Sequence, residues 1–433
     1  MNACRYVRVW YGGKDIMDPS QIDPKEGSGN EINGITLAGV GSGTVVDHCE
    51  VAFNRDDGFE MFGGTVNLKY CSAIFCGDDA FDTDEGYQGN MQFLFAMVGS
   101  GGHHATEMDS KIDEQPRSFP RMYGATFVGG GTINGDDAVM RLREGTGGEF
   151  ANIILTHSTS YGVLNNDCGT EIRGQESATA LASSSTSPNY LFFSKKNIIH
   201  DSHSSLSSVF TGGCSNQFTQ AVTSDPKLRR MPLDADSSSA MVDPRPSSDS
   251  PAYSNYESVP SDSFFTEVDY SGAFGEDLWL SGLSWLDANG KLPANEWGPE
   301  LCGDITSDTT LTADNTYFLT CQTFVKSGAT LTIKKGTTIK ALKDDGLGKA
   351  PTLVIQQGAK IMADGTVDAP ITFTSALPSS QLPATGTWGG LIVLGRAPVI
   401  PKSGSNTRTV EGLDAADGTY GGTSSGDNSG ILR

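Results

Sequence analysis

Acidic residues recur in short frames along the first third of the chain, each after a short apolar run. The first two frames are Asp56–Glu60 and Asp78–Asp82, and the third, His103–Asp109, opens with two histidines. Arg141 and Arg143 follow in a later segment. Carboxylates held close together raise one another's pKa, as a general acid requires, and they offer the oxygen ligands that Ca²⁺ prefers. The frames therefore predict one acidic site, provided that the fold brings them together.

The spacing of the frames indicates how they are brought together. They recur roughly every 22 to 25 residues, and strand-like runs such as Val51–Phe53 and Ala73–Phe75 precede them, which is typical of solenoid coils. One turn of a parallel β-helix takes about this much chain, and equivalent residues of successive coils then lie about 4.8 Å apart. We therefore predict an all-β fold, a parallel β-helix. The side chains expected on one face are Asp56, Asp57, Glu60, Asp78, Asp79, Asp82, Asp84, His103, His104, Glu107 and Asp109, closed off by Arg141 and Arg143.

The net charge and the distribution of apolar residues limit the kinds of partner that the chain can bind. The formal net charge is −22, which argues against nucleic acid because phosphate binding needs a positive surface. No stretch is long and apolar enough to cross a membrane. The charge suits an extracellular or cell-surface protein that binds cations or glycans, and a polyanionic glycan would need a basic patch or a bridging cation.

The eight cysteines show no CxxC spacing, so a zinc–thiolate site is not expected. Cys302 and Cys321 flank one short segment and are the best disulfide candidates. Cys49, Cys71 and Cys76 lie in apolar runs and are expected to be buried thiols.

The chain is expected to divide into β-helix coils over 1–292, a linker over 293–301 and a second set of coils over 302–433. Within the first part, Asp277–Trp285 carries aromatics at helix-like spacing, and we expect it to cover the open end of the coil stack. The first residues, Met1–Gly13, read as a strand and not as a signal peptide, so a signal was removed or the chain begins inside a larger protein.

Several long motifs resemble those of a family of secreted right-handed parallel β-helix proteins and lipoproteins from marine bacteria and algae, whose members are mostly uncharacterised. The motifs are Tyr6–Gly13, Glu31–Gly43, Asp56–Asn67, Met140–Gly147, Val325–Gly336, Thr352–Ala363 and Gly386–Gly395. The resemblance implies a right-handed parallel β-helix. In the family the block like 302–433 precedes the block like 6–292. The reversed order here favours a piece of a tandem-module protein, the rear of one module and then the front of the next, over a circular permutation.

Part of the acidic patch is similar to the site of polygalacturonases, which are inverting β-helix glycosidases. The matching residues are Asn54-Arg55-Asp56, Asp78-Asp79, Gly102-His103 and Arg141-Leu142-Arg143. Arg143 stands where that family has lysine, and His104 stands where it has glycine.

This similarity implies a set of catalytic roles. Asp79 would be the general acid, and Asp56 and Asp78 would activate water from the opposite side. His103 would orient these groups. Substrate carboxylates or hydroxyls would be bound by Arg141 and Arg143, with Glu107 beside them.

Two plainer interpretations stay open for the same residues. The carboxylates can cap backbone amides at turns, or bind structural calcium, for which Asp57, Asp82 and Asp84 are the candidate ligands. The chain is therefore either a surface module that binds a polysaccharide, a cell-surface glycan or a surface partner, possibly with calcium, or a carbohydrate-active hydrolase or lyase. Carboxylates that face each other across an open groove would favour the enzyme, and carboxylates folded back onto amides would favour the module.

Overall fold

The computed structural model describes most of the chain and divides it into two compact units. The described residues are 3–14, 32–110, 116–131, 138–158, 161–166, 191–200, 210–211, 222–238, 240–293, 298–343, 349–377, 382–401 and 404–433. The first unit comprises Met1–Ser237 and Asp243–Asn289, and the second comprises Ser238–Val242 and Gly290–Arg433. None of the described helices has the length and apolar character needed to span a bilayer.

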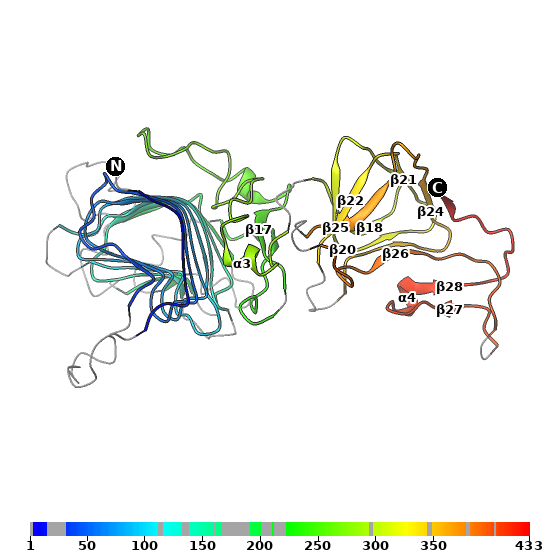
Figure 1. Ribbon diagram of the computed structural model, residues 1–433, viewed down its shortest axis with the longest axis horizontal. Coiled ribbons are helices and arrows are strands. Elements are labelled where there is room, and N and C mark those ends of the chain that lie inside the picture. The colour runs from blue at the N-terminus through cyan, green and yellow to red at the C-terminus, as the bar shows by residue number, and fades with distance from the viewer. Residues whose placement is uncertain are drawn as a thin grey trace. The chain divides into compact units, whose positions relative to one another are not determined.

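The first unit is a right-handed parallel β-helix built from two parallel sheets (Figure 1). The strands of the first sheet are β1 (Ala3–Trp10), β3 (Val45–Ala52), β5 (Asn67–Ile74), β7 (Asn90–Met97), β9 (Arg121–Val128), β11 (Gly148–Thr156), β13 (Leu191–Phe193) and β14 (Ile198–His200). Those of the second sheet are β2 (Ile35–Thr36), β4 (Phe59–Phe62), β6 (Phe81–Asp84), β8 (Thr106–Met108), β10 (Ala138–Leu142), β12 (Tyr161–Asn165) and β15 (Phe210–Thr211). From β1 to β13, odd-numbered strands fall in the first sheet and even-numbered strands in the second, because the chain visits each sheet once per coil; β14 then adds to the first sheet and β15 to the second.

The long strands of the first sheet bend at one residue in the left-handed backbone region. His48 and Tyr70 have φ of 52°, and Phe93 has φ of 56°. Such a conformation costs free energy for residues other than glycine. The rings stack from coil to coil, with centroids 4.6 Å apart for His48 and Tyr70 and 4.8 Å apart for Tyr70 and Phe93. This aromatic ladder offsets the strain at the bend, and the bend turns each coil back toward the second sheet.

Apolar side chains that point inward fill the coils. In the second sheet, Phe59 stacks on Phe81 with ring centroids 5.2 Å apart, and both rings are fully buried. Alternation along each strand then points the intervening residues, such as Glu60 and Asp82, outward. Cys49, Cys71 and Cys76 are buried free thiols, as the sequence predicts.

Residues 250–289 run along the outer side of the coils. The backbone amide of Gly272 donates to the carbonyl of Asn152, the Lys69 ammonium donates to the carbonyl of Phe264, and the amide of Trp285 donates to Glu50. This corrects the expectation for Asp277–Trp285: the segment covers the flank of the stack rather than its open end. Its aromatic rings find partners in the outward-facing aromatic residues at the bends, which the sequence did not single out.

The second unit is a smaller parallel coil stack. Its first sheet holds β18 (Glu300–Ile305), β20 (Thr316–Val325), β22 (Thr338–Ala341), β23 (Thr352–Ile355), β25 (Thr372–Ser375) and β26 (Gly390–Val393). Its second sheet holds β19 (Thr309–Leu311), β21 (Thr330–Ile333), β24 (Lys360–Ala363) and β29 (Gly430–Leu432). An antiparallel hairpin pairs β27 (Arg408–Thr409) with β28 (Thr419–Tyr420).

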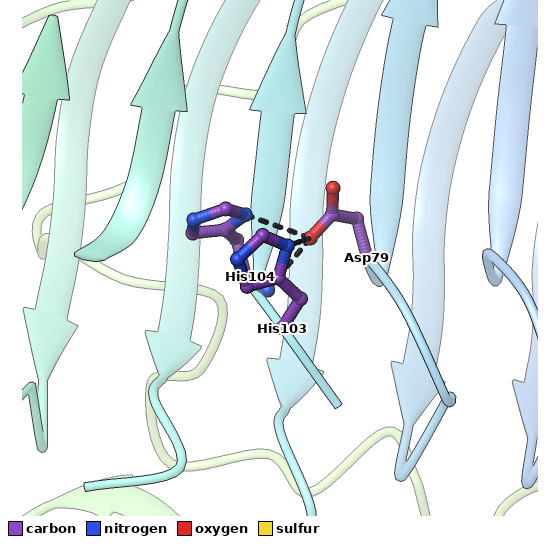
Figure 2. Close-up of side chains that lie close together, drawn as sticks. All are labelled: Asp79, His103 and His104. Carbon is purple, nitrogen blue, oxygen red and sulfur yellow. Dashed lines mark hydrogen bonds and ion pairs between the residues drawn. The ribbon is translucent and has the colours of Figure 1, made fainter. Parts of the chain in front are cut away.

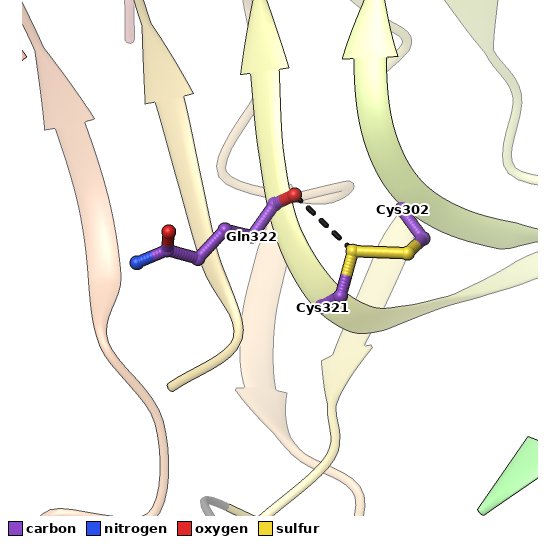
Figure 3. The surroundings of a disulfide bond; sticks show 3 residues. All are labelled: Cys302, Cys321 and Gln322. Atoms are coloured by element: carbon purple, nitrogen blue, oxygen red, sulfur yellow. Dashed lines mark hydrogen bonds between the residues drawn. A yellow bond between two sulfur atoms is a disulfide. The ribbon is translucent and has the colours of Figure 1, made fainter. Parts of the chain in front are cut away.

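A disulfide joins Cys302 of β18 to Cys321 of β20, which confirms the pairing expected from the sequence (Figure 3). The expected linker over 293–301 overlaps the start of β18, and residues 294–297 lie outside the described residues.

Candidate functional site

Four charged residues form a column on the outer face of the second sheet. The register pairs Glu60 with Asp82, Asp82 with Glu107 and Glu107 with Arg141, so that each of four successive coils contributes one residue. Asp109 lies two residues after Glu107 and therefore on the same face. We call Glu60, Asp82, Glu107 and Asp109 the carboxylate row.

Two arginines bind one end of the row. The Arg141 guanidinium lies 2.8 Å from Glu107 Oε1, and Arg143 lies 3.1 Å from Glu107 Oε2. Arg143 Nε also donates to Asp109 Oδ2 at 2.5 Å. The structure thus brings together the three residues that the sequence suggested for substrate binding, Arg141, Arg143 and Glu107.

Two carboxylate oxygens of the row are buried and lack a hydrogen-bond partner within the described part of the chain. They are Oδ1 of Asp82 and Oδ1 of Asp109. Asp82 is 9% exposed and Asp109 is 4% exposed. Since an ionised oxygen without water or a donor is costly to bury, each needs a proton or a cation.

The pKa values of these carboxyl groups are raised, which agrees with their burial and with the two oxygens for which the described residues offer no hydrogen-bond donor. Burial raises the pKa of Asp57 to about 9, and the nearby Asp79 carboxylate adds to the rise. Burial also raises the pKa of Asp109 to about 8 and that of Glu60 to about 7. The pKa of Asp82 is raised well above its ordinary range by burial and then by the charges of Asp57 and Asp109. The folded first unit therefore favours protonated carboxyl groups here unless a cation neutralises them.

The donor set fits a hard divalent cation. Oxygens of Asp57, Glu60 and Asp82 lie within 4.8 Å of one another, and so do oxygens of Asp82, Glu107 and Asp109. Asp82 belongs to both groups. All donors are carboxylate oxygens, which suits Ca²⁺.

Of the calcium ligands suggested by the sequence, Asp57 and Asp82 come together, and Asp84 does not join them. Asp84 Oδ1 instead accepts a hydrogen bond of 2.6 Å from the backbone amide of Glu85. Asp109, which the sequence placed on the shared face without a specific role, supplies one of the two partnerless oxygens. The sequence signal for this role was its spacing of two residues from Glu107, which places both side chains on the same face of the sheet.

The Asp79 carboxylate is directed at the next coil (Figure 2). Its Oδ1 accepts from the backbone amide of His104 at 2.6 Å and lies 2.9 Å from His104 Nδ1. In the same manner, Asp57 Oδ1 accepts from the backbone amide of Asp79 at 2.9 Å. Each carboxylate caps the amide that starts the equivalent turn of the following coil. This is the folded-back arrangement that favours a binding or structural module over a hydrolase.

The other suggested catalytic residues lie at the same edge. The nearest oxygens of Asp56, Asp57 and Asp78 lie within 4.8 Å of one another. In the assigned roles Asp56 and Asp78 both act on water, so their closeness to each other leaves open the separation of about 6.5–9.5 Å that an inverting glycosidase needs between its acid and its base. His103 Nδ1 lies 3.3 Å from Asp78 Oδ1. The four residues Asp56, Asp78, Asp79 and His103 are thus neighbours, but they form a compact cluster.

Glu50 is a buried charged group that the sequence did not single out. Its Oε1 accepts from the backbone amide of Trp285 at 2.6 Å and from Trp10 Nε1 at 3.1 Å, and its Oε2 accepts from the Ser72 hydroxyl at 2.8 Å. Burial raises its pKa to about 7 although these hydrogen bonds lower it. Glu50 therefore anchors the flanking segment to the coils and is no part of the outward site.

The fold and the outward charged column define the class: a right-handed parallel β-helix protein whose coils present acidic residues in register. A family model described as a pectate-lyase-like beta helix domain matches residues 2–225 and 303–433, and the chain belongs to that family. Searches of curated proteins and of solved structures found no match for the chain.

Proposed function

We propose that the chain is an extracellular or cell-surface β-helix module that binds acidic glycans through calcium held at the carboxylate row. The observation that carries this proposal is the pair of buried oxygens on Asp82 and Asp109 that have no hydrogen-bond partner among the described residues. A cation there satisfies both oxygens and stabilises the ionised carboxylates, which burial and then mutual repulsion otherwise disfavour.

The class of glycan follows from charge. A chain of net charge −22 repels a polyanion over most of its surface. A bound divalent cation reverses this repulsion locally and leaves coordination positions for sugar carboxylates. Arg141 and Arg143 stand directly beside it and offer donors with the geometry that a carboxylate accepts. Family membership agrees with a polysaccharide partner.

The alternative is a carbohydrate-active enzyme, and two observations speak against it. Asp79 is engaged with the backbone of His104, so it is poorly placed to protonate a leaving group. A lyase needs a base that is unprotonated before it abstracts the substrate proton, and Arg143 is unsuited to that role. Burial lowers the pKa of Arg143, but the Asp109 and Glu107 carboxylates raise it by more, so that it lies above its ordinary value.

Calorimetric titration tests the proposal. We expect the full chain to bind Ca²⁺, and to bind oligogalacturonate only when Ca²⁺ is present. Asp82→Asn should abolish both, since it removes the carboxylate shared by the two oxygen groups. Asp314→Asn, an exposed change in the second unit, is the matched control and should leave both unchanged.

Two outcomes would overturn the proposal. One is binding of oligogalacturonate that persists in a chelator and in Asp82→Asn. The other is release of unsaturated or reducing sugar ends that disappears in Asp79→Asn, which would establish the enzyme instead.

A further inference from the structure

We propose a second cation site of different chemistry at the neighbouring edge of the coils, formed by His103 and His104 with the carboxylates of Asp79 and Asp78, and selective for a borderline divalent metal such as Zn²⁺. We call these four residues the histidine cluster. It shares no ligand with the carboxylate row, and it does not depend on the proposed glycan function.

Geometry carries the first step. One ring nitrogen of His103, one of His104 and a carboxylate oxygen of Asp79 lie within 4.8 Å of one another. Both rings turn toward the same Asp79 oxygen (Figure 2), at 2.9 Å for His104 and 4.0 Å for His103. Asp78 Oδ1 lies 3.3 Å from His103 Nδ1, outside this group of three, and a small movement of its exposed side chain would supply the fourth ligand. Zinc sites use the same ligand number and the same ligand types.

The register of the coils explains why the donors converge. Asp78 and Asp79 precede β6, and His103 and His104 precede β8, which pairs with β6 in parallel. Backbone hydrogen bonds from the amide of His103 to the carbonyl of Asp78 and from the amide of Ala80 to the carbonyl of His104 hold the two turns against each other. The ligands therefore come from two stacked turns of a rigid sheet edge, which favours a preformed site.

Burial gives the cluster an inner and an outer half. The His104 side chain is 0% exposed and that of Asp79 is 4% exposed, whereas those of His103 and Asp78 are 47% and 51% exposed. The inner pair is fixed by packing and by the hydrogen bond between Asp79 and the His104 amide. The outer pair faces solvent and provides the route by which a metal enters.

Donor type separates this site from the carboxylate row. Two imidazole nitrogens and two carboxylate oxygens suit zinc and other borderline metals, while a set made only of carboxylate oxygens suits calcium.

The test is a titration of the full chain with Zn²⁺ alone as the probe, with Ca²⁺ at saturating concentration so that the carboxylate row is occupied. We expect one zinc per chain. His103→Ala should weaken zinc binding by about tenfold or more, and Asp78→Asn should weaken it as well. Both changes fall on half-exposed side chains, so the fold should persist, and circular dichroism checks this.

The carboxylate row supplies the matched control. Asp82→Asn should leave zinc binding unchanged, and His103→Ala should leave calcium binding unchanged. Failure of calcium binding alone would refute the proposed function and not this site.

X-ray absorption at the zinc edge distinguishes the ligands. We expect a shell of nitrogen and oxygen without sulfur, which would exclude zinc bound by cysteine thiols; among the described residues the free thiols are those of Cys4, Cys49, Cys71 and Cys76. The inference is overturned by absence of zinc binding, by zinc affinity that is unchanged in His103→Ala, or by a sulfur shell.

Discussion

At the scale of single residues, the first unit holds carboxyl groups whose pKa values are raised by burial. The unfolded chain has no such effect, so protonation favours the folded state. Their contribution to stability is fully present below about pH 4 and is lost as the pH rises through the folded pKa values of about 8 and about 9 for Asp109 and Asp57.

Asp82→Asn isolates this contribution. Without calcium, the variant should melt at a higher temperature than the wild type at about pH 8, because Asp82 ionises more readily in the unfolded chain than in the folded one and asparagine does not ionise; the difference should vanish near pH 4. Calcium should raise the melting temperature of the wild type and not that of the variant. Differential scanning calorimetry across pH, with and without a chelator, measures both effects. A wild type whose stability does not decline toward alkaline pH would contradict the raised pKa values.

Glu50 gives a second prediction at this scale. Glu50→Ala leaves the buried Trp285 amide and Trp10 Nε1 without their acceptor and should lower the free energy of unfolding by about 3 kcal/mol. Glu50→Gln keeps one acceptor oxygen and should cost less. It should also remove the loss of stability that Glu50 causes as the pH rises from about 4.5, its ordinary value, through its folded pKa of about 7. Urea unfolding of the three proteins at several pH values tests this ranking, and equal losses in both variants would exclude the proposed role of the acceptor.

At the scale of elements, the bends in the long strands depend on the aromatic ladder. Tyr70 stacks on both His48 and Phe93 while its backbone has φ of 52°. Tyr70→Ala loses both stacks but keeps a Cβ in the strained conformation, and we expect a cost of about 2 kcal/mol. Tyr70→Gly loses the same stacks and relieves the strain.

The two substitutions therefore make an internal comparison. Glycine should be at least as stable as alanine at position 70, although glycine normally destabilises a strand. Denaturant unfolding of the two variants provides the measurement. Alanine more stable than glycine would show that the bend stores no backbone strain.

At the scale of the whole molecule, the two units have separate cores, and the disulfide lies entirely in the second. Cys302 and Cys321 are 19 residues apart, and loss of a link that closes such a loop costs about 3 kcal/mol. Replacing both with serine should lower the melting transition of the second unit only. Calorimetry should resolve this as a shift in one transition, while calcium shifts the other. A calcium effect on both transitions would argue against independent units.

Much of the fold was predictable because it depends on local pattern and on repetition. A period of roughly 22 to 25 residues, with apolar residues alternating along short runs, has a stacked coil as its natural solution. That register alone aligns Glu60, Asp82 and Glu107. The route of Asp277–Trp285 was not predictable, because its rings pack on residues of several coils that no local pattern links to it.

The candidate site divides in the same way. The amino-acid sequence by itself determined that acids and histidines from distant frames would become neighbours, because coils stacked in register place residues that are one repeat apart in the sequence next to each other. Only the tertiary structure decided which carboxylates are left without a hydrogen-bond donor and which accept a hydrogen bond from a backbone amide of the next coil. Asp82 and Asp79 look alike in the sequence, yet Asp82 keeps a buried oxygen for which the described part of the chain offers no donor, while Asp79 accepts a hydrogen bond from the His104 amide. Solvation and hydrogen-bond partners are supplied by neighbouring coils, so these properties arise only when the coils stack.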